Sequence, residues 1–274
     1  MAEQGRTVLI TGANSGIGLA TALELARRGF DSVGSVRSAA KARAVRKAAA
    51  EAGVEVRTVL LDVTDAAACG RVIGRLKPWG LVNNAGASFT GAVEDVGDEE
   101  ARAALETMVV APVRLARLSV PHMRAAGSGR IVNVSSIYGL ATTPLTGWYQ
   151  GAKHALEGVS DALRMEVARD GIAVILVEPG SIKTALWDVA EVDMRGRDAS
   201  RHHDAYRRSL AAIRMARPFM ASSNRAAKVI ARALTSRLPR PRYLVGVDAQ
   251  ATAIAARFVP TEVVDRVSRL TLGL

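Results

Sequence analysis

Tyr149 and Lys153 are the residues whose types and spacing are best suited to chemistry, because they stand four apart. On a helix, this spacing puts both side chains on one face, where they can contact one ligand. A phenol with a pKa of about 10 is a poor acid or base at neutral pH, but a nearby ammonium favours the phenolate. We therefore expect Tyr149 to exchange a proton with a substrate oxygen. The alternative is a tyrosine and a lysine on a solvated helix face.

Ser136 is the third candidate, at the end of an apolar run over 130–134 that predicts a buried strand. Its hydroxyl would hydrogen-bond the same substrate oxygen as Tyr149. The ammonium of Lys153 would in addition bind the ribose hydroxyls of a nucleotide. These three residues are the predicted catalytic group.

A glycine-rich stretch, 11–18, separates an apolar run at 8–10 from an amphipathic run at 19–28. This order predicts a strand, a tight turn and a helix. Glycines let the backbone approach a ligand, while the free N–H groups and positive dipole of the helix end attract a phosphate. We expect a dinucleotide here. The spacing G-x-x-x-G-x-G differs from the commoner fingerprint, so a turn without a ligand is the alternative.

The elements that must position these residues alternate between strands and helices of 10 to 15 residues. Such alternation predicts an α/β fold, a parallel sheet with helices on both faces. The chain has no internal repeat or low-complexity linker, so we expect one domain over 1–274. The predicted strands are 8–10, 32–36, 54–61, 81–83, 130–134, 172–177 and 243–245. The predicted helices are 19–28, 39–52, 65–75, 98–124, 147–169, 224–236, 249–258 and 261–270, with Thr64 capping the third.

Composition restricts the setting of the protein. Cys69 is the only cysteine, so no intrachain disulfide can form and a cytoplasmic location is expected. Neither residues 1–6 nor any later run has the apolar length of a signal peptide or a membrane span. The formal net charge of +11 lies in 195–242, which contains 13 Lys and Arg residues and only two acidic residues, Asp198 and Asp204. A solvated basic face, an acidic partner or peripheral contact with an anionic membrane would each suit this segment.

Five motifs occur in one order over 7–184, and together they resemble the short-chain dehydrogenase/reductase family. They are T-G-x-x-x-G-x-G at 11–18, N-N-A-G at 83–86, the Ser136 position, Y-x-x-x-K at 149–153 and P-G-x-I-x-T at 179–184. The resemblance implies a Rossmann-type doubly wound sheet, a nicotinamide cofactor over the glycine turn, hydride transfer, and Tyr149 as general acid/base. The cofactor-binding residues that it implies are Gly12, Asn14, Ser15, Gly16, Ile17, Gly18, Arg37, Asp62, Val63, Asn84, Ala85, Gly86, Tyr149, Lys153, Pro179, Gly180, Ile182 and Thr184.

The choice of cofactor depends on the end of the second strand, where Val36 and Arg37 stand in place of a carboxylate. A carboxylate there would accept a hydrogen bond from the ribose 2′-hydroxyl, whereas a guanidinium binds a 2′-phosphate. We therefore expect NADP(H) in preference to NAD(H). Ser38 and Lys41 are further candidate contacts, although Lys41 also fits a solvated helix. Asp62 corresponds to the family's adenine-binding position or, alternatively, begins a helix.

Met108 departs from the family pattern, because an asparagine usually stands at this position and supports a proton relay to the lysine. Methionine cannot form the hydrogen bonds of an amide. A backbone carbonyl and water can maintain the relay, and this is the interpretation that we favour. The alternative is a catalytically weak NADP(H)-binding sensor or partner-binding protein.

The stretches at 113–117, 149–158 and 241–246 resemble the branch that contains hydroxysteroid and retinol dehydrogenases, which implies a lipophilic steroid-, retinoid- or acyl-like substrate. A helical substrate lid is expected at about 185–222, where apolar residues alternate with arginines. His202 and His203 lack the partners of a metal site, so no metal is expected. The resemblance also implies a homodimer or homotetramer through helices 98–124 and 147–169. No nucleic-acid motif accompanies the basic segment, so nucleic acid is not an expected partner.

Overall fold

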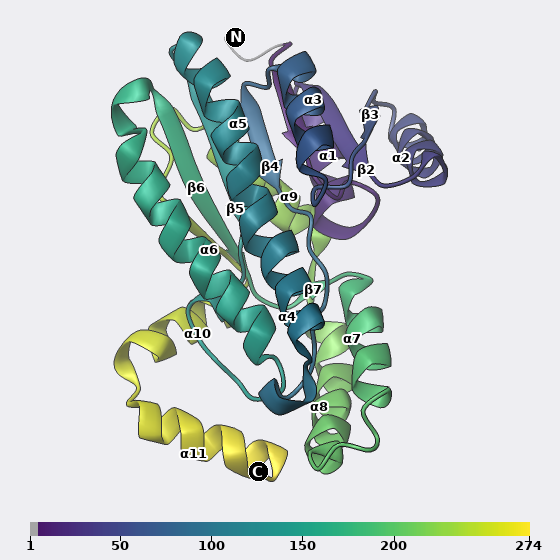
Figure 1. The fold of residues 1–274 in the computed structure, drawn as a ribbon, viewed down its shortest axis with the longest axis vertical. Helices are drawn as coiled ribbons and strands as arrows, with labels where there is room; N and C mark the ends of the chain where they lie inside the picture. The colour runs from purple at the N-terminus through teal and green to yellow at the C-terminus, as the bar shows by residue number, and fades with distance from the viewer. Residues whose placement is uncertain (1–4) are drawn as a thin grey trace.

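The computed structural model describes residues 5–274, and its core is a seven-stranded parallel sheet (Figure 1). The expectation for residues 1–6 concerns mainly residues 1–4, which lie outside the described residues. The strand order is β3-β2-β1-β4-β5-β6-β9, so the order reverses between β1 and β4. The strands are β1 (Thr7–Ile10), β2 (Asp31–Val36), β3 (Arg57–Leu60), β4 (Gly80–Asn83), β5 (Gly129–Val134), β6 (Ile172–Pro179) and β9 (Arg242–Val245). The predicted doubly wound α/β fold is confirmed.

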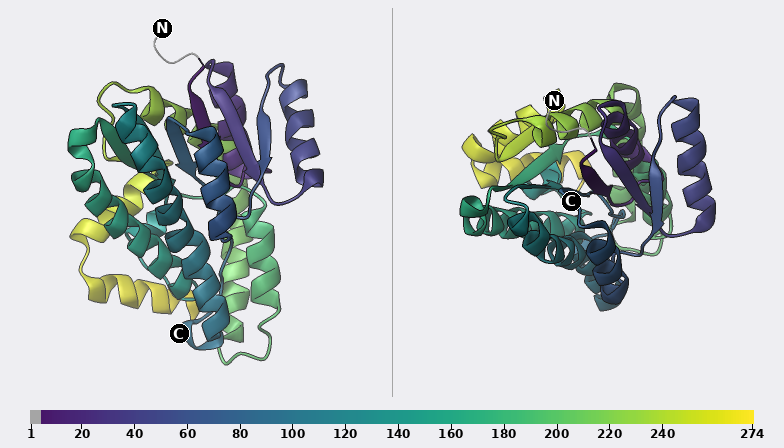
Figure 2. Two further views of the ribbon diagram at one scale, coloured as in Figure 1. Left: turned by 45° about the horizontal axis from the view of Figure 1, so that its top comes forward. Right: turned by 90° about the horizontal axis from the view of Figure 1, so that it is seen from above.

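Helices cover both faces of the sheet. Successive side chains of a strand point to opposite faces, so each strand contributes to both apolar layers. In β1, Val8 and Ile10 join one apolar cluster, whereas Leu9 joins the other. The helices of the Val8 face are α1 (Gly16–Arg27), α2 (Ala39–Glu51) and α9 (Ser223–Thr235). The opposite face carries α3 (Ala66–Leu76), α5 (Ala111–Ala125) and α6 (Gly147–Glu166) (Figure 2).

The helix predicted over 98–124 is divided into three parts. It consists of α4 (Asp98–Leu105), a π-helical segment at Glu106–Val110, and α5. π-helical turns inside helices are rare and occur frequently at functional sites. This one contains Met108, the residue that departs from the family pattern.

Two other local predictions were wrong in detail. Asp65, not Thr64, caps α3, because its carboxylate accepts a hydrogen bond from the Ala68 N–H at 2.9 Å. An aspartate side chain reaches the free N–H groups of the first turn as well as a threonine does, so residue type alone does not separate these neighbours. The strand predicted over 54–61 is shorter, since only Arg57–Leu60 pairs with β2.

The segment after β6 is helical, with α7 (Leu186–Arg195), α8 (His203–Ala216) and a short 3-10 helix at Arg217–Phe219. Two-residue strands β7 (Ile182–Lys183) and β8 (Ala221–Ser222) pair where this segment leaves and rejoins the sheet domain. The helices α10 (Val247–Phe258) and α11 (Thr261–Leu272) follow β9, and α11 reaches α8 (Figure 1). Within residues 5–274, no helix is both long and apolar enough to cross a membrane.

Candidate active site

The glycine turn after β1 is closed so tightly that side chains would not fit. A Cβ at Gly18 would lie 2.4 Å from the Gly12 carbonyl oxygen, and one at Gly12 would lie 3.0 Å from the Ala85 Cα. Gly12 and Gly16 also have positive φ values, +66° and +54°, which favour glycine. The turn therefore brings bare backbone to the carboxyl end of β1.

Asn84 and Thr11 hold this turn against the end of β4. The Asn84 side chain donates to the Thr11 carbonyl at 2.9 Å, and the Thr11 hydroxyl accepts from the Asn84 and Ala85 N–H groups, each at 2.9 Å. The turn and the N-N-A-G motif thus meet at the point where the strand order reverses. Ligands of open parallel sheets bind in the crevice at such a point.

The first turn of α1 is available to an anion. Ser15 is in the N-cap position, but its side chain accepts no hydrogen bond from the helix backbone. Asn14 donates weakly to the Ser15 hydroxyl at 3.3 Å, while Ile17 packs against the apolar core. The N–H groups at this helix end and its dipole suit a phosphate, so the residues present fit a dinucleotide.

Arg37 and Asp62 lie at the ends of neighbouring strands, and both are exposed. Asp62 accepts hydrogen bonds from the N–H and hydroxyl of Thr64, which lower the pKa of its carboxyl together with the Arg37 charge. The Val63 side chain is buried in the core, and its carbonyl accepts hydrogen bonds from Cys69 and Arg114. Ser38 caps α2, because its hydroxyl accepts a hydrogen bond from the Lys41 N–H at 3.3 Å. Arg37 is thus the exposed cation at the end of β2.

The predicted catalytic residues come together at the end of β5. Ser136 follows β5, while Tyr149 and Lys153 lie on the first turns of α6. The Lys153 Nζ lies 5.7 Å from the centre of the Tyr149 ring and donates to the Val134 carbonyl at 2.8 Å. Ser136 and Lys153 are buried, with 8% and 7% exposure, whereas Tyr149 is partly buried beside Tyr138.

The electrostatics of this group differ from the sequence expectation. Burial raises the pKa of Tyr149 to about 12, although the Ser136 hydroxyl opposes the rise. Burial also lowers the pKa of Lys153 to about 8, and the Glu157 charge opposes that fall. The expected lowering of the Tyr149 pKa by lysine is absent here, and Lys153 donates to the Val134 carbonyl. Tyr149 therefore holds its proton at neutral pH.

Met108 fills its position with apolar contacts. It is buried in a cluster with Ala104 and Ala152, and Phe89 and Tyr149 pack against the same cluster. The thioether thus supports the tyrosine through packing, where an asparagine would contribute hydrogen bonds. The π-helical segment keeps the backbone of this region irregular despite the replacement.

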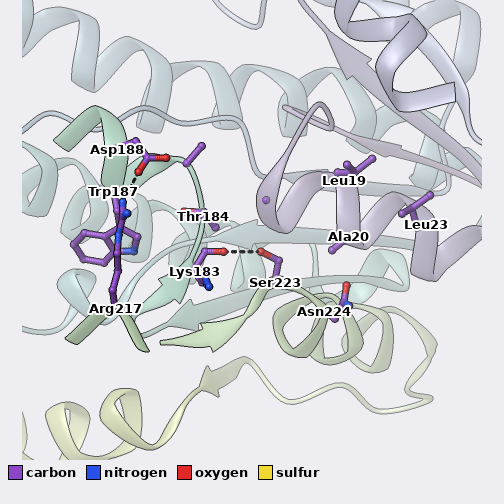
Figure 3. A pocket seen from close by; sticks show the side chains of 12 residues that line it. Leu19, Ala20, Leu23, Lys183, Thr184, Trp187, Asp188, Arg217, Ser223 and Asn224 are labelled. Atoms are coloured by element: carbon purple, nitrogen blue, oxygen red, sulfur yellow. Dashed lines mark hydrogen bonds and ion pairs between the residues drawn. The ribbon is translucent and has the colours of Figure 1, made fainter. Parts of the chain in front are cut away.

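The segment after β6 lies next to the glycine turn. A Cβ at Gly16 would lie 3.1 Å from the Thr184 Cγ2, so these two predicted residues are neighbours. Pro179 ends β6, Gly180 donates its N–H to the Val245 carbonyl, and Ile182 is buried. A pocket of about 490 Å³ beside Thr184 and Gly16 also contains Trp187 and Arg217 from the helical segment (Figure 3).

Sequence reasoning missed the contacts that hold the helical segment in place. Arg197 donates to the Thr90 and Asp95 carbonyls and pairs with Glu100 at 2.8 Å. The Tyr206 hydroxyl donates to the Asp95 carboxylate at 2.7 Å. These partners are about 100 residues apart in the chain, and no local pattern signals such pairs. Glu94 is the partner of His202, and no metal-binding group of His, Cys, Asp and Glu occurs in residues 5–274.

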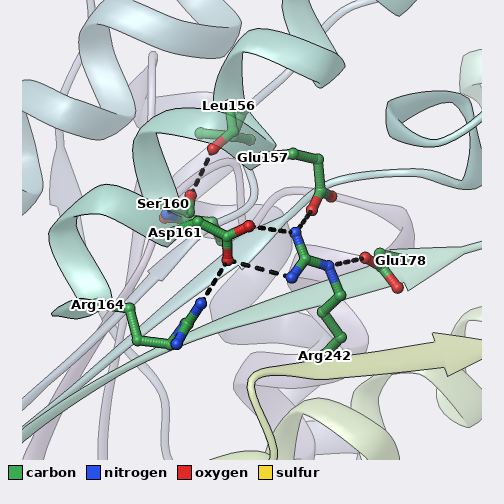
Figure 4. A network of polar contacts seen from close by, with 8 residues as sticks. Leu156, Glu157, Ser160, Asp161, Arg164, Glu178 and Arg242 are labelled. Carbon is green, nitrogen blue, oxygen red and sulfur yellow. Dashed lines mark hydrogen bonds and ion pairs between the residues drawn. The ribbon is translucent and has the colours of Figure 1, made fainter.

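A second missed feature is an ionic network next to the catalytic group, formed by Glu157, Asp161, Glu178 and Arg242 (Figure 4). Its one sequence signal is that Glu157 follows Lys153 by four residues, which is one turn of α6. Glu178 immediately precedes the predicted Pro179–Thr184 motif.

Comparison with known proteins agrees with this geometry. The family model described as short chain dehydrogenase matches residues 6–194, so the chain belongs to the short-chain dehydrogenase/reductase family. A crystal structure of a short-chain dehydrogenase from Streptomyces avermitilis has a TM-score of 0.76 at 30% identity, covering 97% of this chain and 99% of that one. A metagenomic short-chain oxidoreductase in complex with NADP has a TM-score of 0.70 at 25% identity, covering 89% and 98%.

Two curated relatives extend the comparison. The uncharacterized oxidoreductase YusZ of Bacillus subtilis is 37% identical over 216 residues, covering 76% of this chain and 77% of the relative. The 3-ketodihydrosphingosine reductase of Bacteroides thetaiotaomicron is 33% identical over 217 residues, covering 77% and 76%. The protein is an oxidoreductase of a family that uses NAD(P)(H) and small-molecule substrates.

Proposed function

We propose that this protein transfers a hydride between NADP(H) and a carbonyl or secondary alcohol of a lipophilic substrate, with Tyr149 as general acid/base. The convergence of Ser136, Tyr149 and Lys153 at the end of β5, beside the glycine turn, carries this proposal. NADP(H) supplies or accepts the hydride when it is bound.

The proton chemistry belongs to the side chains. Tyr149 keeps its proton because burial raises its pKa to about 12, so it donates to a carbonyl oxygen only as that oxygen gains negative charge. The Lys153 ammonium stabilises the phenolate that remains. Ser136 donates a hydrogen bond to the same substrate oxygen and orients it. In the oxidation direction the same groups run in reverse.

Arg37 supports NADP(H) over NAD(H), because it is an exposed cation at the end of β2. The relative solved with NADP is consistent with this preference. The Arg37→Asp variant should weaken NADPH binding far more than NADH binding, measured by the fluorescence of each cofactor on titration. An exposed arginine on α2 provides the control, since Arg43→Ala should change both affinities little. An equal loss for both cofactors in Arg37→Asp would contradict the preference.

A lipophilic substrate is supported by the segment at about 185–222, which we propose as the lid of a single domain. Leu186, Val189 and Phe219 expose apolar surface there. The name of one relative indicates a lipid ketone, 3-ketodihydrosphingosine. We test the substrate class by following NADPH absorbance with a panel of lipid, steroid and retinoid ketones and small polar ketones. Faster turnover of the lipophilic members is expected, and turnover of the small polar ketones alone would contradict it.

Self-association and surface contact are further proposals. Val110, Val159 and Met165 expose apolar side chains on the 106–110 segment and α6, which suits a homodimer or homotetramer through these helices. The basic residues of 195–242 suit peripheral contact with an anionic membrane or an acidic partner. Light scattering tests the first proposal, and sedimentation with anionic and neutral vesicles tests the second. A monomer, or equal binding to both vesicles, would contradict the respective proposal.

A second candidate function, an NADP(H) sensor with weak catalysis, is favoured by Met108, whose side chain offers no strong hydrogen bond near Tyr149. Tight NADPH binding without turnover across the panel would support it.

A further inference from the structure

Two nearly inaccessible carboxylates belong to the ionic network next to the catalytic group. Glu157 is 5% exposed and Glu178 is 1% exposed, and both contact the Arg242 guanidinium. The Arg242 Nη2 lies 3.0 Å from the Glu157 Oε2, and its Nε lies 3.1 Å from the Glu178 Oε1. Figure 4 shows Arg242 reaching from β9 between α6 and β6 to meet both.

Asp161 occupies the outer side of the same guanidinium. It accepts from the Arg242 Nη1 at 3.1 Å and Nη2 at 2.7 Å, and it also pairs with Arg164 at 2.9 Å. This carboxylate is thus balanced by two arginines. Glu157 and Glu178 both pair with the single positive charge of Arg242, so the inner part of the network holds more negative than positive charge.

One proton resolves the excess. Burial and the facing Glu157 charge raise the pKa of Glu178 to about 7, while Arg242 opposes the rise. Burial also raises the pKa of Glu157, but the Ser135 hydroxyl and Arg242 oppose it. The pKa near 7 makes Glu178 the group that takes up a proton close to neutral pH, while the Ser135 hydroxyl and Arg242 favour the ionised form of Glu157.

Glu157 is placed to act on the lysine. It follows Lys153 by one turn of α6, and their side chains share a helix face. Lys153 also lies near groups from the elements packed around it. These are the Val134 carbonyl at the end of β5, the Tyr149 ring on α6 with Tyr138 beside it, and the apolar Met108 cluster. Glu157 is the acidic side chain whose charge opposes the fall in the Lys153 pKa.

We propose that Glu157 is a positioning residue that keeps Lys153 protonated for catalysis, with Arg242 and Glu178 holding Glu157 in place and ionised. This inference rests on the proposed function of Lys153 beside Tyr149. A site with Met108 in place of the family's asparagine thus obtains electrostatic support from Glu157.

The proposal has a defined pH signature. Lys153 must be charged to stabilise the Tyr149 phenolate, so carbonyl reduction should fall as pH rises through the lysine pKa, which lies near 8. Neutralising Glu157 removes an attractive charge and lowers that pKa further. The alkaline limb of kcat/KM should therefore move to lower pH in Glu157→Gln, by about 1 unit.

The test measures the lysine directly. NMR titration of ¹³C-labelled lysine, with Lys153→Met to assign the signal, gives the Lys153 pKa in the full chain without substrate. Glu157→Gln should lower it by about 1 unit, and Glu157→Asp should restore most of the wild-type value. Asp161→Asn is the matched control, since it removes a carboxylate from the same network while leaving the Glu157 charge, and it should stay near wild type.

Each outcome decides the question. An unchanged Lys153 pKa in Glu157→Gln, or an equal fall in Asp161→Asn, would overturn the proposal. Glu157→Met, an apolar replacement of similar size, is the second neutral variant if the buried amide prevents folding, and it should lower the pKa in the same way. A shifted pKa in a protein that turns over no substrate would retain the electrostatic role and refute the proposed function instead.

Discussion

The glycine turn and the lid are held by different kinds of contact. In the turn, Gly18 lies so close to the Gly12 carbonyl oxygen that a Cβ would not fit, and the Asn84 side chain donates to the Thr11 carbonyl. In the lid, Arg197 and Tyr206 reach carboxylates and carbonyls far away in the chain. The first kind of contact leaves no room for a Cβ at Gly18, although Thr11 and Asn84 are 73 residues apart in the chain. The second depends on the assembled fold, and each of its bonds is individually replaceable.

This difference explains what the sequence could predict. The strand-turn-helix order and the 83–86 and 149–153 motifs placed the fold and the candidate site, because each is a local pattern with a direct backbone meaning. Arg242 could not be placed, since its partners Glu157 and Glu178 come from other elements and its residue type looks like surface charge. The interruption at 106–110 was also missed, because a π-helical segment has nearly the same periodicity as the helix around it.

The largest effect on cofactor binding is expected from Gly18→Ala. The added methyl would lie 2.4 Å from the Gly12 carbonyl oxygen and 2.5 Å from the Asn84 side-chain nitrogen, so the turn must deform. NADPH affinity, measured by fluorescence titration, should fall at least about 100-fold, with a loss of roughly 1–3 kcal/mol in stability. Gly74→Ala is the control, because its Cβ meets no atom within 4 Å on α3 and helix propensity improves. Retained NADPH affinity in Gly18→Ala would show that the turn has room for a side chain at this position.

Arg242→Met should destabilise the fold by roughly 3–5 kcal/mol near pH 8, because it leaves buried carboxylates without their cation. The carboxylates can relieve this by taking up protons, which raises their folded-state pKa values further. Stability from such protonation grows as pH falls, so the deficit should shrink between pH 8 and pH 5. Urea unfolding at several pH values measures it. A deficit that stays constant with pH would contradict the buried network.

The smallest effect is expected from Tyr206→Phe in the lid. It removes the hydroxyl that donates to Asp95 at 2.7 Å and accepts from the Ala92 N–H at 2.6 Å. We expect a loss of about 1–3 kcal/mol in stability and a higher KM for substrate, with NADPH affinity unchanged. His203→Ala, at an exposed position on α8, is the control and should change neither quantity. A fall in NADPH affinity would show that lid and turn are not separate.

The central claim is that Tyr149 performs proton transfer in a site that binds NADPH, and one paired measurement tests it most directly. Turnover of a lipophilic ketone is followed by NADPH absorbance in wild type and in Tyr149→Phe, with NADPH affinity measured for both. We expect kcat to fall by about 100-fold or more in the variant while the affinity for NADPH stays the same. Equal turnover in the two proteins, with equal NADPH affinity, would contradict it.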